Sequence, residues 1–461
     1  MKLTLIVPNF DTYVLAPQLG ILYISSYLKK YGHEVFIIDA LRDNLSCNEI
    51  IKKVEDYKPD AVGIHCLSSF VDEVSKISKL LKEKNYKVFV GGVHPTFSPY
   101  STLVETKADY VVLGEGEIPI LKLANNNFEN NNIQGVYSID DLENNEYLKD
   151  GSKVQLAEII KDLDEIPFPD WEQIPPDSYP QAPHAVFAKG YPIGIVTTSR
   201  GCPFRCTFCS SHNFYKGGVR FRSVDNVIAE IKFQIEKFKI KELQFIDDNL
   251  TLKKEYAMEL CQKMIDEGIK IDWTPINGIR ADSLTKEVAE KMKEAGCYLV
   301  DFGIESVNPQ ILKNIKKGET IEQITEAINC AHEAGMLTIG NFIFGLPGET
   351  KETIEETISY AVNSKLDRAG FFALNVLPGS DIAKELKEKK GIDIQQSSLF
   401  SSAQYLVCDL TKRQIEKYVQ KAYWKFYFRP KILYNSLKSI PFKQYKYFVK
   451  CLMKYNIFKF W

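Results

Sequence analysis

Three cysteines with a spacing that suits a metal centre stand near the middle of the chain. Cys202, Cys206 and Cys209 form a C-x3-C-x2-C pattern just after the apolar run 193–196. Thiolates are soft ligands that select iron–sulfur clusters or zinc. Three of them hold three corners of a four-iron cluster and leave the fourth iron open, which makes the site a place for chemistry. Arg200 and Arg205 are expected to favour the thiolate form of these metal-binding, catalytic cysteines.

A structural zinc site is the alternative for this loop. His212 lies three residues beyond Cys209 and could complete a Cys3His set. However, no second ligand pair follows at zinc-finger spacing, and a chain of 461 residues does not depend on a metal staple. The iron–sulfur interpretation is favoured, and a zinc-stabilised, non-catalytic binding protein stays open.

The cysteine loop resembles the cluster motif of the radical S-adenosylmethionine (radical SAM) enzymes, including the aromatic Phe208 between its last two cysteines. The flanking segments resemble the subgroup that carries an N-terminal cobalamin (B12)-binding domain, over most of residues 1–400. The resemblance implies three cofactors: a [4Fe–4S] cluster, S-adenosylmethionine and cobalamin. It also implies a reducing electron donor, such as flavodoxin or ferredoxin, as a partner.

Length and composition restrict the class of protein. The 461 residues predict two or three domains, and 45% hydrophobic with 26% charged residues is ordinary for a soluble globular protein. A net charge of -2 argues against a nucleic-acid binder. The N-terminal apolar run is too short for a signal peptide, and no run reaches membrane-spanning length. Because the other seven of the ten cysteines are scattered singly, a reducing, cytoplasmic location is expected.

Residues 1–135 alternate short apolar runs with segments of helical periodicity, which predicts a doubly wound, Rossmann-like parallel sheet. Ligands of such sheets bind at the carboxyl ends of the strands. The apolar runs lie at 3–7, 35–39, 61–64, 88–92 and 110–114. The loops that follow them contain several glycines, although a purely structural domain with the same pattern is an alternative.

The resemblance identifies this region as a cobalamin-binding domain through residues 17–23, 32–35, 92–96 and 114–117. The D-x-H-x-x-G signature of cobalamin mutases is absent, which leaves open that the domain has lost cobalamin. His65 and His94 are the candidate histidines near strand ends, and each is more often a hydrogen-bonded loop residue than a metal ligand. The residues implied as cobalamin contacts are Pro8, Gly20, Ser68, Gly92, His94, Gly114 and Glu115.

An Asn-rich patch at 125–132 is followed by six prolines between 167 and 183, and residues 136–190 are predicted to be a linker. Strand–helix alternation then resumes over 191–385, with strands expected at 193–197, 243–247, 271–276, 298–304, 337–344 and 370–376. Six such units predict a partial (β/α)6 TIM-type barrel whose catalytic groups lie at the carboxyl ends of its strands.

Polar side chains collect at those predicted strand ends, and the resemblance assigns them to S-adenosylmethionine. The group after the second strand falls at the amino-group contact of that family. The Glu-Ser pair after the fourth strand falls at the methionine and ribose contact, and the loop aromatic and the end of the fifth strand fall near adenine. A carboxylate at a strand end can also be only a helix cap. The implied contacts are Phe208, Asp247, Asp248, Asn249, Arg280, Glu305, Ser306, Ile343 and Gly345.

The segment 386–461 is predicted to be helical and is rich in basic and aromatic residues. It fits a lid over an apolar or anionic substrate, a peripheral membrane contact, or a helical cap packed on the barrel. Single-stranded nucleic acid is a minor alternative.

These features predict a cobalamin-dependent radical SAM enzyme. The leading hypothesis is a C-methyltransferase that uses a 5′-deoxyadenosyl radical to activate an unreactive carbon of a small molecule. Cyclisation, rearrangement or oxidation by the same domains is the alternative within the family.

Overall fold

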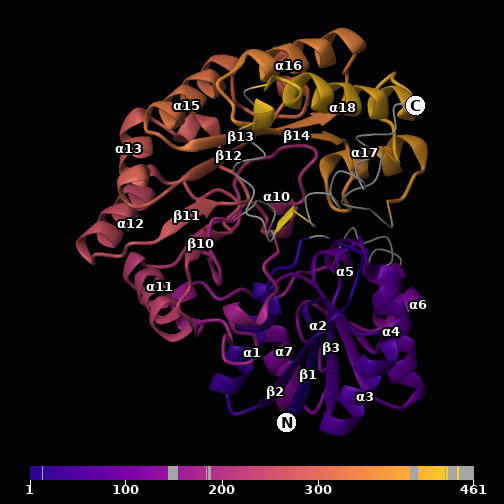
Figure 1. Ribbon diagram of the computed structural model, residues 1–461. Coiled ribbons are helices and arrows are strands. Elements are labelled where there is room, and N and C mark those ends of the chain that lie inside the picture. The colour runs from indigo at the N-terminus through magenta and orange to yellow at the C-terminus, as the bar shows by residue number, and fades with distance from the viewer. Residues whose placement is uncertain are drawn as a thin grey trace. The chain divides into compact units, whose positions relative to one another are not determined.

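The structure is a computed structural model that describes residues 1–12, 14–143, 154–182, 184, 188–394, 403–430, 432–434 and 444–445. The chain divides into two compact units (Figure 1). The N-terminal unit comprises residues 1–180, 377–379 and 383–398, and the barrel unit comprises residues 181–376, 380–382 and 399–461. Most of the predicted linker therefore belongs to the N-terminal unit.

The N-terminal unit contains a six-stranded sheet with the order β2-β1-β3-β4-β5-β6. The first five strands are parallel and β6 pairs antiparallel with β5, so the predicted doubly wound sheet is confirmed. The strands are β1 (Lys2–Val7), β2 (Glu34–Asp39), β3 (Ala61–His65), β4 (Lys87–Gly91), β5 (Tyr110–Val112) and β6 (Val136–Tyr137). The helices are α1 (Leu19–Lys30), α2 (Ala40–Asp43), α3 (Cys47–Tyr57), α4 (Val71–Glu83), α5 (Val93–Phe97), α6 (Pro99–Thr106), α7 (Glu117–Asn125) and α8 (Ile139–Glu143), with 3-10 turns η1 (Leu163–Glu165) and η2 (Pro176–Ser178).

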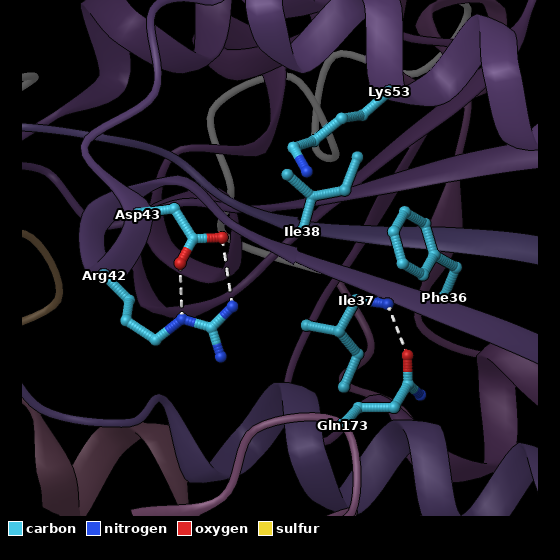
Figure 2. Close-up of a pocket in the computed structure, with 7 residues that line it drawn as sticks. All are labelled: Phe36, Ile37, Ile38, Arg42, Asp43, Lys53 and Gln173. Atoms are coloured by element: carbon cyan, nitrogen blue, oxygen red, sulfur yellow. Dashed lines mark hydrogen bonds and ion pairs between the residues drawn. The ribbon is translucent and has the colours of Figure 1, made fainter. Parts of the chain in front are cut away.

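The proline-rich segment after this sheet is bound to the edge of the sheet through the side chain of Gln173. Strand β2 is an edge strand, and Gln173 accepts the Ile37 N–H at 3.0 Å and donates to the Val35 carbonyl at 3.0 Å. A pocket of about 260 Å³ lies beside this edge, where Arg42 pairs with Asp43 at 2.7 Å (Figure 2). An edge strand whose polar groups are satisfied in this way is protected from pairing with another chain.

The barrel unit contains two parallel three-stranded sheets, ordered β11-β10-β7 and β12-β13-β14. Bridges from Trp273 to Cys297 and from Ile279 to Phe302 join them into the predicted six-stranded partial barrel. The strands are β7 (Ile193–Val196), β8 (Ser199–Arg200), β9 (Arg220–Phe221), β10 (Glu242–Phe245), β11 (Asp272–Pro275), β12 (Leu299–Glu305), β13 (Leu337–Phe344) and β14 (Arg368–Ala373). The helices are α10 (Ser211–Phe214), α11 (Val224–Phe238), α12 (Lys254–Asp266), η3 (Ala281–Ser283), α13 (Lys286–Glu294), α14 (Pro309–Asn314), α15 (Ile321–Glu333), α16 (Lys351–Asn363) and α18 (Lys412–Tyr427); α17 (Asp381–Lys390) has residues in both units.

Helix α18 covers the open edge of the barrel sheet. The Tyr423 hydroxyl accepts the Phe371 N–H at 3.2 Å, and the Tyr427 hydroxyl accepts the Ala369 N–H at 3.1 Å. The expectation of a helical cap is thus confirmed for Lys412–Tyr427, while most of the basic-aromatic tail beyond it lies outside the described residues. Within the described part of the chain, no helix has the length and apolarity needed to span a membrane.

Candidate active site

The cysteine loop is an excursion between two short paired strands. Strands β8 and β9 pair antiparallel at its base. Gly201 has a φ of 105°, and a Cβ there would lie 2.0 Å from the Gly218 carbonyl, so the close return of the loop requires glycine. Inside the loop, Thr207 donates its N–H to the Ile315 carbonyl at 3.0 Å. The base of the loop and its middle are therefore both fixed to the barrel.

The three cysteines are partly buried, and their sulfurs lie within electrostatic range of one another. Burial raises the pKa of Cys202, and burial raises the pKa of Cys206 to about 11. In both cases charge on the Cys209 sulfur raises the pKa further. Arg280 counteracts the rise at both thiols and Lys317 does so at Cys206, so these two cations support the thiolates. The sequence predicts the same role for Arg200 and Arg205.

Lys317 belongs to a buried charge cluster beside the cysteines that sequence reasoning missed. Its ammonium lies 3.6 Å from the Glu305 carboxylate and 3.3 Å from that of Glu319. Arg280 donates to the Lys317 carbonyl at 2.7 Å, and its guanidinium stacks 3.6 Å from the centre of the Phe204 ring in the cysteine loop. Nothing in the sequence around Lys317 predicts a role at the cysteines. Only folding brings this residue close to the loop.

The predicted contacts after β10 have different surroundings. Asp247 is buried and accepts hydrogen bonds from Thr198 and Ser199. Asp248 is exposed, lies 3.1 Å from the Ser211 hydroxyl and is close enough to raise the pKa of Cys202. Asn249 is buried, and its Nδ2 has no hydrogen-bond partner. A buried amide donor left unpaired beside the cysteine loop fits a ligand with an acceptor group.

The other predicted contacts lie at the ends of β12 and β13. Glu305 has a φ of 65° and is 8% exposed, facing Lys317. Ser306 is fully buried, with its hydroxyl 3.4 Å from that of Thr357 in α16. Ile343 and Phe208 are partly accessible to solvent. Gly345 has a φ of 93° and lies against Ile415 of α18.

The zinc alternative would need His212 to join the three cysteines on one ion. His212 packs its ring against Gly217, and its Nδ1 is buried without a partner. Among the residues that the structure describes, no three His, Cys, Asp or Glu side chains are grouped around a single metal ion. A zinc site needs four ligands on one ion, whereas a four-iron cluster takes each thiolate on a different iron. The donor set of the loop fits the cluster.

The carboxyl ends of β3 and β4 form the candidate site of the N-terminal unit. The Ser68 hydroxyl lies 2.9 Å from Nδ1 of His94, which leaves Nε2 of His94 buried without a partner. Nε2 of His65 and the Ser69 hydroxyl are also buried and unpartnered. Burial lowers the pKa of both histidines to about 4, so they are neutral. Three unpaired polar atoms at strand ends fit a large polar cofactor that would satisfy them.

Gly92 is the residue that shapes this site. Its φ is 123°, and a Cβ would lie 2.5 Å from the Cys66 carbonyl. The Gly114 N–H donates to the Thr96 hydroxyl at 2.9 Å, which ties the next strand end to α5. Of the remaining predicted contacts, Pro8 follows β1, Glu115 follows Gly114, and Gly20 is an exposed residue of α1 with open space around it.

Two family models match the chain in the expected order. The B12 binding domain matches residues 10–124 and the Radical SAM superfamily matches residues 196–361. These matches confirm the predicted pairing of domains and, at the level of the family, the predicted set of [4Fe–4S] cluster, S-adenosylmethionine and cobalamin. The residues that hold each cofactor stay predictions.

Curated relatives cover most of the chain. An uncharacterized methyltransferase of Pyrococcus horikoshii is 34% identical over 95% of each chain. The cytidylyl-2-hydroxyethylphosphonate methyltransferase of Streptomyces wedmorensis is 30% identical over 82% of this chain and 79% of its own. The anaerobic magnesium-protoporphyrin IX monomethyl ester cyclase of Rubrivivax gelatinosus is 29% identical over 81% and 67%. The relatives thus include two kinds of reaction.

A solved structure shares the fold. The cobalamin-dependent S-adenosylmethionine radical enzyme OxsB, with aqua-cobalamin and S-adenosylmethionine bound, superposes with a TM-score of 0.74. It is 18% identical and covers 98% of this chain and 71% of its own. At this identity the likeness concerns the fold alone.

Proposed function

Because the chain belongs to the radical SAM superfamily and carries a B12 binding domain, we propose that it is a C-methyltransferase acting on an unactivated carbon of a small molecule. The observation that carries the proposal is the C-x3-C-x2-C loop, whose Phe204 stacks on Arg280 while Arg280 in turn binds the Lys317 carbonyl. Methylation is favoured because two relatives, similar along 79–95% of their own length, are methyltransferases.

The cysteine loop would hold the cluster through Cys202, Cys206 and Cys209. When bound, the cluster and S-adenosylmethionine supply a 5′-deoxyadenosyl radical, and the electron comes from a donor such as flavodoxin or ferredoxin. The chain's own contribution is charge and position. Arg280 and Lys317 offset the negative charge of three thiolates in a half-buried loop, where low dielectric makes that charge costly.

The polar groups around the loop suit the methionine part of S-adenosylmethionine. The unpaired Nδ2 of Asn249 is a donor for a carboxylate, and Lys317 offers a cation beside Cys206. Asp248, which is exposed and close to Cys202, is an acceptor for the ammonium group. The adenine would then contact Phe208, Ile343 and the segment at Gly345, as the family resemblance implies.

Cobalamin would be held by the carboxyl ends of β3, β4 and β5 in the N-terminal unit, and it supplies the methyl group when bound. His65, Ser69 and His94 each present an unpaired polar atom there. Ser68 fixes one nitrogen of His94 and leaves the other, buried nitrogen for a ligand. Gly92 has no side chain, which lets the backbone beside these residues pass close to the Cys66 carbonyl.

Formation of a ring is the second candidate reaction, and the cyclase relative of Rubrivivax gelatinosus favours it. The radical-forming residues would be the same. The two reactions differ in product mass, since methylation adds one methyl group and cyclisation removes hydrogens or leaves the mass unchanged.

The test is purification without oxygen from cells supplied with cobalamin. A brown protein with about four irons that consumes S-adenosylmethionine under reducing conditions is expected. Product mass, measured on candidate substrates with S-adenosylmethionine labelled in its methyl group, then separates methylation from cyclisation. A colourless protein with a single zinc would refute the enzymatic proposal.

A further inference from the structure

Asp247 is engaged by the start of the cysteine loop. Its Oδ1 accepts the N–H groups of Thr198 at 3.0 Å and Ser199 at 2.6 Å. The same oxygen accepts the hydroxyls of Thr198 at 2.7 Å and Ser199 at 2.6 Å. Asp247 is 3% exposed, and Thr198 and Ser199 are 0% and 4% exposed. Four donors thus converge on Oδ1, which leaves that oxygen no capacity for a ligand, and Oδ2 lies 3.1 Å from the Thr198 nitrogen.

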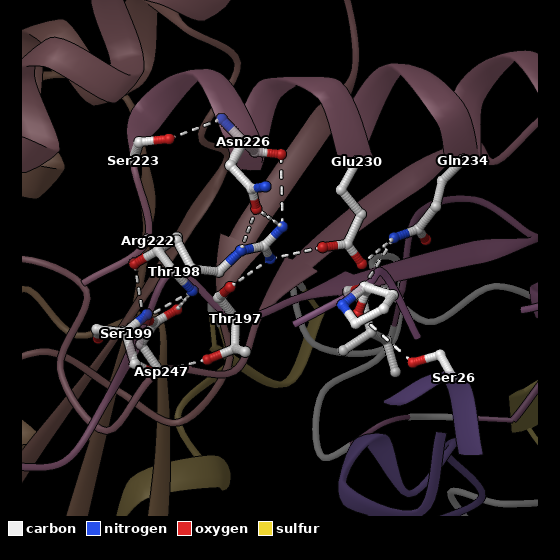
Figure 3. A network of polar contacts seen from close by, with 12 residues as sticks. Ser26, Thr197, Thr198, Ser199, Arg222, Ser223, Asn226, Glu230, Gln234 and Asp247 are labelled. Carbon is white, nitrogen blue, oxygen red and sulfur yellow. Dashed lines mark hydrogen bonds and ion pairs between the residues drawn. The ribbon is translucent and has the colours of Figure 1, made fainter. Parts of the chain in front are cut away.

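A second set of contacts holds the same backbone from the other strand of the loop base. The Arg222 N–H donates to the Thr198 carbonyl at 2.8 Å, and its guanidinium donates to the Thr197 carbonyl at 2.9 Å. That guanidinium is buried with Glu230 at 2.5 Å and also donates to the Asn226 side chain at 2.6 Å. Figure 3 shows Asp247 and Arg222 meeting the three residues 197–199.

The held segment ends three residues before Cys202. Residues 197–199 connect β7 to the loop, and Asp247 follows β10, the neighbouring strand. Fixing both backbone donors of Thr198 and Ser199 sets the direction in which the chain enters the loop. A loop that presents several thiolates to one cluster depends on such a fixed entry, because small displacements misplace its ligands.

We propose that Asp247 is a positioning residue that fixes the entry of the cluster loop, rather than a contact to S-adenosylmethionine. This inference rests on the proposed function, since it concerns the loop that would hold the cluster. The carboxylate is the suitable group because it only accepts hydrogen bonds. An asparagine keeps one oxygen for these donors but turns its Nδ2 donor towards the Thr198 N–H, so that two donors face each other in a buried place and Nδ2 has no acceptor there.

Asp247→Asn is the test, and Asp367→Asn is its matched control. Asp367 accepts the Thr338 N–H at 3.0 Å and the Thr338 hydroxyl at 3.2 Å, which is the same chemistry at the amino end of β13, away from the cysteine loop. Both variants and the wild type are made without oxygen. Iron content, the rate of iron loss to a chelator, the electron paramagnetic resonance spectrum of the reduced cluster and the affinity for S-adenosylmethionine are measured.

Asp247→Asn is expected to lose iron to the chelator roughly ten- to a hundred-fold faster than wild type, from the cost of unpaired buried donors. Its resonance spectrum should change, and Asp367→Asn should match the wild type in both respects. If Asp247→Asn does not fold, Thr198→Val and Ser199→Ala replace it in the test. Each removes one hydroxyl donor to Asp247, and each should lose iron faster than the wild type.

Two results would overturn the inference. Wild-type iron retention and spectrum together with at least tenfold weaker S-adenosylmethionine binding would make Asp247 a ligand of the cosubstrate. Equal behaviour of Asp247→Asn and Asp367→Asn would make it an ordinary structural residue. A wild type without iron would instead refute the proposed function, and this inference with it.

Discussion

Replacing Lys317 by methionine tests the charge cluster beneath the cysteine loop. Methionine keeps most of the length of the side chain and removes its charge. Lys317 is buried together with its two carboxylates, with the side chains of Lys317, Glu305 and Glu319 8%, 10% and 0% exposed. The substitution leaves Glu305 without the cation at 3.6 Å, while Glu319 keeps Arg280 at 4.0 Å.

The expected loss of stability follows from this burial. Removing one partner of a buried ion pair costs about 3–5 kcal/mol, because the remaining charge is uncompensated. Burial already raises the pKa of Glu305, and loss of Lys317 raises it further. A carboxyl whose pKa is raised on folding stabilises the folded state while it is protonated. That contribution is lost as the pH rises from the pKa of the carboxyl in the unfolded chain to its pKa in the folded protein. The loss of unfolding free energy caused by Lys317→Met should therefore be smaller at acidic pH and larger at basic pH.

The assay is urea unfolding of the anaerobically prepared protein at about pH 5 and about pH 8, followed by circular dichroism and tryptophan fluorescence. Lys316→Met is the control, since Lys316 is 60% exposed and pairs with Asp381 at 3.5 Å, a contact worth at most about 1 kcal/mol. Adding Glu305→Gln to Lys317→Met should restore part of the loss and flatten the pH dependence. If Lys317→Met unfolds like Lys316→Met at both pH values, the charge cluster does not stabilise the fold as argued.

Three further outcomes are expected. Cys206→Ala should abolish reductive cleavage of S-adenosylmethionine and leave bound cobalamin unchanged in the visible spectrum, because the proposed sites of the two cofactors lie in different units. Unchanged cleavage would contradict the assigned site. Tyr423→Phe and Tyr427→Phe should each lower the free energy of unfolding by about 1–3 kcal/mol by leaving β14 N–H groups unpaired, and hydrogen exchange at Phe371 and Ala369 should rise accordingly. Burial raises the pKa of Glu349 to about 8. The wild type should therefore lose stability as the pH rises from the ordinary pKa of a carboxyl to about 8, and Glu349→Gln should abolish that dependence. If the variant unfolds with the same pH profile as the wild type, Glu349 is not a buried neutral carboxyl.

The order of strands and helices was predictable because it depends on local periodicity. Apolar runs such as 3–7 and 193–196 are buried strands in the structure, and the strand ends carry the polar residues that the pattern placed there. Parallel strands joined by helices bring their carboxyl ends to one edge, so the two candidate sites followed from topology. The spacing of the three cysteines indicated the cluster chemistry without any structure.

Tertiary structure decided what individual side chains do at those sites. Asp247 and Asp248 are adjacent in sequence, yet one is buried under four donors and the other faces solvent. Lys317 lowers the pKa of Cys206, although it stands 111 positions further along the chain. The proline-rich stretch around Gln173 pairs with an edge strand instead of forming a free linker. Sequence carries the periodicity that builds elements, but the pKa, exposure and partners of a side chain depend on distant segments that only folding brings within a few ångströms of it.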